Sequence, residues 1–296
     1  MPSHVELAAM RRAIGISATG LGRTSPNPPV GCVILDQEGA VVGEGYHLRK
    51  GEAHAEVNAL AAAGDRAQGG TAVVTLEPCN HHGRTPPCRQ ALLDAGVHRV
   101  LIAVMDPTSR GDGGASVLRD AGVTVETGVL EDEALTVLGP WLTATTSGRP
   151  VVTWPYLVDG TAVRALPDEL LAAEVLRQHA DAILRPDGRV TEAVPDSHGP
   201  GILHLRDINP AVELPAAALK SIHGGGVRSL LLSGHADLGE RFASAGLVDR
   251  IVAYLAPVTP SSEGYSGLPL PGLPRGFRIT AAGRGSSMVR VEAEPI

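Results

Sequence analysis

Helical and strand patterns alternate along the first half of the chain. Apolar residues recur at helical spacing in some segments, and short runs rich in Val, Ile and Leu lie between them. The predicted helices cover residues 5–18, 53–63, 87–95 and 115–121. The predicted strands cover residues 31–35, 41–44, 71–76, 99–104 and 123–127. This order predicts a three-layer α/β domain with helices on both faces of one sheet.

A stretch of small polar residues, Thr143–Pro150, interrupts the pattern and predicts a linker between two domains, residues 1–146 and 147–296. The 296 residues are enough for two domains, each with its own core. The second half again predicts an α/β domain. Its expected strands are 151–154, 182–184, 229–232 and 250–255, and its expected helices are 167–179, 216–223 and 239–245.

Charge and hydropathy narrow the class of protein. The formal net charge is −7, which argues against a broad nucleic-acid surface and favours a small-molecule substrate. No apolar run approaches the roughly 18 to 20 residues that cross a bilayer, and the N-terminus lacks the features of a secretory signal. We therefore expect a cytoplasmic protein without membrane or nucleic-acid partners.

Chemistry-bearing residues gather in two short motifs. The first contains His54 and Glu56, and the second contains Cys79 and Cys88 in a segment rich in Pro and His. In a reducing compartment such a pattern indicates a metal site rather than a disulfide. The third cysteine, Cys32, lies in an apolar run and is expected to be a buried strand residue.

One imidazole and two thiolates leave a fourth position open on a tetrahedral ion, which is typical of catalytic zinc. Glu56 lies two residues after His54, so its carboxylate can lie beside the open position and carry a proton. Zinc nucleobase deaminases use a similar H-x-E and P-C-x-x-C arrangement. Here Cys79 and Cys88 are nine positions apart rather than three.

Two other interpretations of these motifs stay open. In the first there is no metal: His54 caps a helix, Glu56 is solvated, and the cysteines belong to the core. In the second, zinc is structural and His81 or His82 completes the tetrahedron.

The first half resembles the deaminase domain of the bifunctional riboflavin biosynthesis deaminase/reductase family, over about residues 1–146. The resemblance rests on Pro26-Asn27-Pro28-Pro29-Val30-Gly31, Gly45-Tyr46-His47, Gly51-Glu52-Ala53-His54-Ala55-Glu56, Thr75 through Cys88, and Asp106-Pro107. It implies a cytidine-deaminase-like three-layer αβα domain followed by a shortened dihydrofolate-reductase-like α/β domain. It also implies hydrolytic deamination of a phosphoribosylated diaminopyrimidine, with His54, Cys79 and Cys88 on zinc.

By the same resemblance, Asn27, His47, His81 and Arg84 are expected to bind substrate. Arg84 stands where the family often has lysine, and either cation suits the ribose 5-phosphate.

The second half departs from the family pattern at three places. Pro155 replaces an expected lysine, Ala193 an expected aspartate, and Ser233-Gly234-His235 an expected glutamate-diglycine turn. A side chain on a glycine position obstructs a dinucleotide phosphate. We therefore expect a degenerate reductase-like domain that does not use NADPH and serves packing or dimerisation, in a homodimer or higher homo-oligomer.

Three other functions stay open at this point. They are a related deaminase of secondary metabolism, an enzyme that is still bifunctional, and a non-catalytic protein stabilised by zinc.

Overall fold

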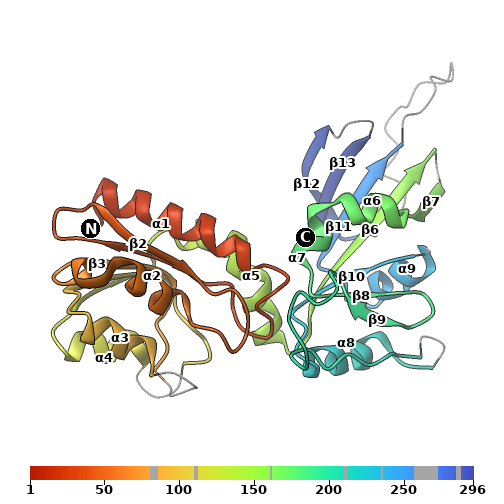
Figure 1. Cartoon of the computed structure of the whole chain (residues 1–296). Helices are drawn as coiled ribbons and strands as arrows, with labels where there is room; N and C mark the ends of the chain where they lie inside the picture. The colour runs from red at the N-terminus through yellow and green to blue at the C-terminus, as the bar shows by residue number, and fades with distance from the viewer. Residues whose placement is uncertain are drawn as a thin grey trace. The chain divides into compact units, whose positions relative to one another are not determined.

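The described residues of the chain form two separate β-sheets (Figure 1). The computed structural model describes residues 1–80, 86–109, 113–160, 162–209, 212–234, 236–256, 273–284 and 288–296. Contacts within the chain divide it into two compact units, Met1–Thr146 and Ser147–Ile296. Within the described residues, no helix has both the length and the apolar character needed to cross a membrane.

The sheet of the first unit has the order β2-β1-β3-β4-β5. Strand β1 pairs antiparallel with both β2 and β3, whereas β3, β4 and β5 are parallel. Parallel pairing brings the carboxyl ends of β3 and β4 to the same edge of the sheet. The strands are β1 (Gly31–Leu35), β2 (Val41–Tyr46), β3 (Thr71–Leu76), β4 (Arg99–Val104) and β5 (Thr124–Thr127).

Helices cover both faces of this sheet, which confirms the predicted three-layer architecture (Figure 1). One face carries α1 (His4–Ser17) and α5 (Glu131–Ser147), which are joined by an ion pair between Arg11 and Glu133 at 2.9 Å. The other face carries α2 (Ala55–Ala63), α3 (Cys88–Asp94) and α4 (Gly113–Asp120). Every residue of β1 and β3 is buried, so these strands form the centre of the core.

Helix α5 corrects the prediction of a linker, because residues 143–147 are helical rather than irregular. Its Thr-rich sequence has weak helix propensity, but its apolar side is packed. Trp141 and Ala144 are buried, and Trp141 Nε1 donates to the Pro26 carbonyl at 3.1 Å. Tertiary packing therefore overrides the local preference.

The sheet of the second unit has the order β12-β13-β11-β6-β10-β8-β9, and β7 pairs with β6. Its centre, β8-β10-β6-β11, is parallel, as the sequence pattern predicts for an α/β domain. The sequence pattern did not predict β7, β9 or the hairpin β12-β13. The strands are β6 (Val151–Asp159), β7 (Ala162–Ala165), β8 (Ala182–Leu184), β9 (Val190–Glu192), β10 (Ser229–Leu232), β11 (Arg250–Leu255), β12 (Phe277–Arg284) and β13 (Val289–Pro295).

Alternate residues of the central strands enter two cores, one on each face of the second sheet. Leu230 and Leu232 pack with α8 (Pro215–Gly224) and α9 (Ala236–Ser244). Leu231 packs on the opposite face. That face is covered by α6 (Asp168–Ala173) and α7 (Val175–His179), which replace the single helix predicted over residues 167–179.

Candidate active site

Three side chains from separate elements converge beside the carboxyl end of β3. His54 Nδ1 lies 3.2 Å from Cys88 Sγ and 3.8 Å from Cys79 Sγ. The ligand atoms of all three residues lie within 4.8 Å of one another. The structure therefore brings together the three residues that the sequence predicts as zinc ligands.

Helix α2 positions His54 and Glu56. His54 is its N-cap residue, and Glu56 lies in its first turn, 3% exposed. The helix approaches β2 closely because Gly43 and Gly45 carry no side chains: a Cβ on Gly45 would lie 2.3 Å from the backbone nitrogen of Ala59. Small residues on both surfaces thus set the depth at which Glu56 is buried.

The two thiols differ in environment. Cys79 lies in the loop after β3, and Cys88 begins α3, where its backbone N–H donates to Cys79 Sγ at 3.2 Å. Hydrogen bonds from Cys88 and His54 lower the pKa of Cys79 to about 4, although burial opposes this shift. The same contact and burial raise the pKa of Cys88. The contact between the two thiols therefore shifts their pKa values in opposite directions.

Glu56 is buried beside the cluster without being one of the three clustered ligands. Burial raises the pKa of its carboxyl group to about 6. A hydrogen bond with Cys79 raises the pKa of His54. A carboxyl group that titrates near neutrality can both accept and release a proton at the working pH, which is what a proton shuttle requires.

The donor set fits zinc. Bond lengths of about 2.3 Å to sulfur and about 2.0 Å to nitrogen in a tetrahedron place the two donor atoms roughly 3.5 Å apart. The observed His54 separations of 3.2 and 3.8 Å bracket this value. Two thiols and one imidazole also suit zinc better than they suit magnesium or calcium, which prefer oxygen ligands.

Asn27 and His47 lie next to this cluster. His47 Nε2 is 3.2 Å from Asn27 Nδ2, and His47 Nδ1 is 3.1 Å from the Ala53 carbonyl. The rings of His47 and His54 meet edge to face with centroids 5.2 Å apart. Burial lowers the pKa of His47, so the neutral ring is favoured. Both residues expected to bind substrate from this side are thus near the candidate metal centre.

The remaining expected residues, His81 and Arg84, lie outside the described residues, as does His82. Their expected roles in substrate binding stay predictions. The interpretation with a fourth protein ligand from His81 or His82 is likewise neither confirmed nor contradicted.

Glu77 is a residue of this region that the sequence analysis did not select. It is 5% exposed, and its two carboxylate oxygens accept from Ser109 Oγ at 2.7 Å and from the Ala115 N–H at 3.0 Å. It therefore ties the start of α4 and the loop after β4 to the segment that carries Cys79. The available signal was an acidic residue that directly follows the predicted strand 71–76 and precedes Pro78.

Comparisons with known proteins agree with this geometry. The family described as the cytidine and deoxycytidylate deaminase zinc-binding region matches residues 4–104. The riboflavin biosynthesis protein RibD of Corynebacterium ammoniagenes is 37% identical, over 89% of this chain and 89% of its own. The diaminohydroxyphosphoribosylamino-pyrimidine deaminase of Buchnera aphidicola from Acyrthosiphon pisum is 52% identical over 42% of this chain and 85% of its own.

Among solved structures, RibD of Acinetobacter baumannii superposes with a TM-score of 0.79, at 27% identity and 99% coverage of both chains. The fold, the His-Cys-Cys cluster and the family match together define a zinc-dependent aminohydrolase with a cytidine-deaminase-like domain. The identity and coverage are more specific: the chain belongs to the RibD family. The fold class and the family expected from the sequence are confirmed.

Proposed function

We propose that this chain deaminates 2,5-diamino-6-(5-phosphoribosylamino)pyrimidin-4(3H)-one to 5-amino-6-(5-phosphoribosylamino)uracil in riboflavin biosynthesis, and that it has lost the reductase step. The observation that carries the first part is the His54, Cys79 and Cys88 cluster beside buried Glu56. The RibD and deaminase relatives supply the substrate class.

In this proposal His54 Nδ1 and the sulfurs of Cys79 and Cys88 hold zinc. Bound zinc acts as a Lewis acid that makes water nucleophilic near neutral pH. Glu56 takes a proton from the attacking water and delivers it to the departing amino group. One water is consumed, the C–N bond breaks, and ammonia leaves while the ring carbon gains a carbonyl oxygen.

The same proposal gives Asn27 and His47 roles in recognising the pyrimidine. His81 and Arg84 would complete the site, with the guanidinium of Arg84 toward the 5-phosphate. A phosphoribosylated substrate would then be held at both ends, by amide and imidazole groups at the ring and by a cation at the phosphate.

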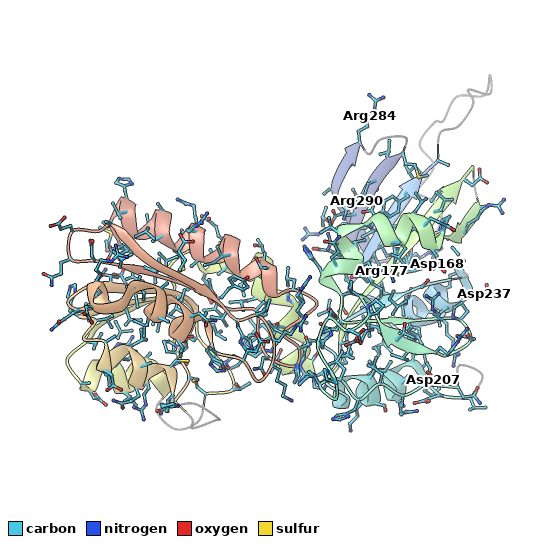
Figure 2. The ribbon with its side chains drawn as sticks, viewed as in Figure 1. Asp168, Arg177, Asp207, Asp237, Arg284 and Arg290 are labelled. Atoms are coloured by element: carbon cyan, nitrogen blue, oxygen red, sulfur yellow. The ribbon has the colours of Figure 1, made fainter. Side chains whose placement is uncertain are left out.

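Three features of the second unit support loss of NADPH binding. Pro155 lies in the middle of β6 and supplies no cation. Ala193 is fully buried, and its carbonyl accepts at 2.6 Å from Nε of Arg177, the residue of α7 that is labelled in Figure 2. At the carboxyl end of β10, the Pro186 ring packs against Gly234. A Cβ on Gly234 would lie 2.1 Å from Pro186 Cγ. A phosphate that approached Gly234 would have to displace this ring.

The second candidate is an enzyme that retains the reductase step. It is favoured by the extent of the RibD match, which covers 89% of the chain and therefore includes most of the second unit.

The test supplies zinc-loaded protein with the diaminopyrimidine phosphate and NADPH, separates products by chromatography and follows NADPH absorbance. We expect the deaminated ribosylaminouracil phosphate to accumulate, with no NADPH consumed. A functional reductase added afterwards should convert the accumulated product. Stoichiometric NADPH consumption by the chain alone would overturn the loss of the reductase step, and failure to release ammonia would overturn the deaminase assignment.

A further inference from the structure

Two short segments that each contain a proposed zinc ligand are joined by direct contacts between protein groups. They are Cys79-Asn80, after β3, and Cys88-Arg89, at the start of α3. Arg89 Nε donates to Asn80 Oδ1, and the Arg89 N–H donates to the Cys79 carbonyl at 3.4 Å. The residue after one ligand therefore holds the residue after the other.

The bond between Arg89 and Asn80 has a fixed direction. A guanidinium group only donates, so Asn80 must present its amide oxygen to Arg89 rather than its NH₂ group. On the helix side, Arg89 Nη1 donates to Gln90 Oε1 at 3.0 Å, and Gln90 Nε2 donates to Asp94 Oδ1 at 2.8 Å. This row of hydrogen bonds along α3 holds the guanidinium in the orientation that meets Asn80.

Helix formation does not explain an arginine at this position. Arg89 is the second residue of α3, close to the positive end of the helix dipole, where a cation is unfavourable. Without partners, this side chain would lower the stability of the helix that positions Cys88. Its hydrogen bonds to Asn80 and Gln90 offset this cost, which points to a role for the side chain outside the helix.

Glu77 and Pro78 anchor the chain on the other side of Cys79. The Glu77 carboxylate accepts from the N–H of Ala115, at the start of α4, at 3.0 Å. Helix α4 approaches closely because Gly114 has no side chain: a Cβ there would lie 1.9 Å from the Pro78 carbonyl oxygen. Helices α3 and α4 are neighbours on the same face of the sheet (Figure 1). Cys79 is thus anchored to α4 by the residues before it and to α3 by the residue after it.

We propose that Asn80 and Arg89 are positioning residues that hold Cys79 and Cys88 at the separation that zinc requires. A metal that binds two side chains nine positions apart must bring the ends of that stretch together, and this closure costs conformational entropy. The bond between Asn80 and Arg89 supplies part of this closure before zinc binds. It therefore raises zinc affinity without contact with the metal or the substrate. This inference rests on the zinc site of the proposed function and adds two residues to it.

Competition with a chromophoric chelator measures the zinc affinity of the variants. They are Asn80→Ala, the double variant and Arg89→Met, which keeps the aliphatic stem without a donor. We expect each single variant to bind zinc roughly tenfold more weakly, the effect of one lost hydrogen bond to a charged group. The double variant should bind no more weakly than either single variant. Losses that multiply to about a hundredfold, or affinities within about twofold of wild type in both single variants, would overturn the proposal.

Two further variants separate positioning from packing and from net charge. Arg89→Lys keeps a cationic donor that can reach Asn80, so its zinc affinity should lie within about threefold of wild type. Arg119→Ala removes an exposed cation from the last turn of α4 and should leave the affinity unchanged. If Arg89→Lys binds zinc as weakly as Arg89→Met, the bond to Asn80 is not the cause and the proposal is wrong. If Arg89→Met does not fold, Asn80→Ala decides alone, because it removes the same bond from the other side.

Steady-state kinetics at saturating zinc give a second readout. In both single variants, kcat and KM for the diaminopyrimidine phosphate should stay within about twofold of wild type, because the pair acts on zinc binding. A raised KM with normal zinc affinity would instead place Asn80 and Arg89 on the substrate and would contradict the proposal. Zinc binding by the wild-type protein is judged separately. A wild-type protein that binds no zinc would overturn the proposed zinc site itself, whereas unchanged affinity in the variants overturns only the role of this pair.

Discussion

The two units use the carboxyl ends of their parallel strands differently. In the first, the segment after β3 carries Cys79 of the polar cluster, and Glu77 ties this segment to Ser109 after β4 and to the start of α4. In the second, the Pro186 ring occupies the space next to Gly234, just after β10. The edge of the first sheet therefore presents donor atoms that face a common point. At the edge of the second sheet, an apolar ring packs beside Gly234 instead.

The scaffold of a unit depends on other features than the chemistry at its strand ends does. The second unit keeps a parallel centre, two cores and the close contact of Gly239 with Trp154. Such features depend on apolar volume and strand pairing, which many sequences satisfy. A catalytic or phosphate site depends on a few polar groups at fixed positions, so single substitutions remove it.

The largest effect is expected at the metal ligands. Cys79→Ser and Cys88→Ser should abolish deamination and lower zinc content, and residues 1–146 should lose several kcal/mol of stability, because metal binding and local folding are linked. Metal analysis and hydrogen exchange check this, and protection in residues 147–296 should not change. Cys32→Ala, at a buried cysteine of β1, should keep its zinc, as should His82→Ala. Full zinc content in both serine variants would show that other residues bind the metal.

The next effect is on turnover alone. Glu56→Gln should keep zinc but lower kcat by about a hundredfold or more, since the amide cannot carry a proton. Glu52→Gln is the matched control, because Glu52 is exposed in the neighbouring loop. Ammonia release measured on metal-quantified samples gives the answer. A rate for Glu56→Gln within about tenfold of wild type would contradict the shuttle role.

A smaller effect tests whether the second unit is only a scaffold. Gly239→Ala places a Cβ 1.9 Å from Trp154 Cε2, so it should destabilise residues 147–296 by about 1–3 kcal/mol. Gly224→Ala in α8, where nothing lies within 4 Å, should be neutral or stabilising. Denaturant unfolding measures both, and deamination below the transition should stay within about twofold. A parallel loss of zinc would show that the units depend on each other.

The smallest effect concerns pH and the first helix. Partial burial raises the pKa of Glu6, but hydrogen bonds from Ser3 and Arg99 outweigh it and hold the pKa below the ordinary 4.5. A carboxyl group whose pKa is lower in the folded state than in the unfolded state stabilises the fold. This contribution is complete at pH values above the unfolded-state pKa and is lost as the pH falls through the folded-state pKa. Glu6→Gln should therefore cost about 1 kcal/mol at pH 7 and nothing at pH values below the folded pKa.

Glu38→Gln, at an exposed turn, should show no such pH dependence. Urea unfolding at several pH values compares the two variants. An equal cost for Glu6→Gln at all pH values would assign the effect to packing rather than charge.

Local patterns predicted most of the elements around the site. The strand Thr71–Leu76 and the helix that begins after His54 were expected within two residues of their observed bounds, because apolar periodicity and glycine positions act locally. Helix α5 and the hairpin β12-β13 were missed. The first depends on burial of Trp141, and β12 is almost wholly exposed, so it lacks the alternation that marks a half-buried strand.

The sequence by itself determined the donor set, because His54, Cys79, Cys88 and Glu56 have few common uses at this spacing. It also determined the family and the two α/β units. Only the tertiary structure decided the distances among the donors, the burial that raises the pKa of Glu56 to about 6, and the contact of His47 with Asn27. These properties arise where segments remote in sequence meet, and local patterns carry no information on how closely such segments approach.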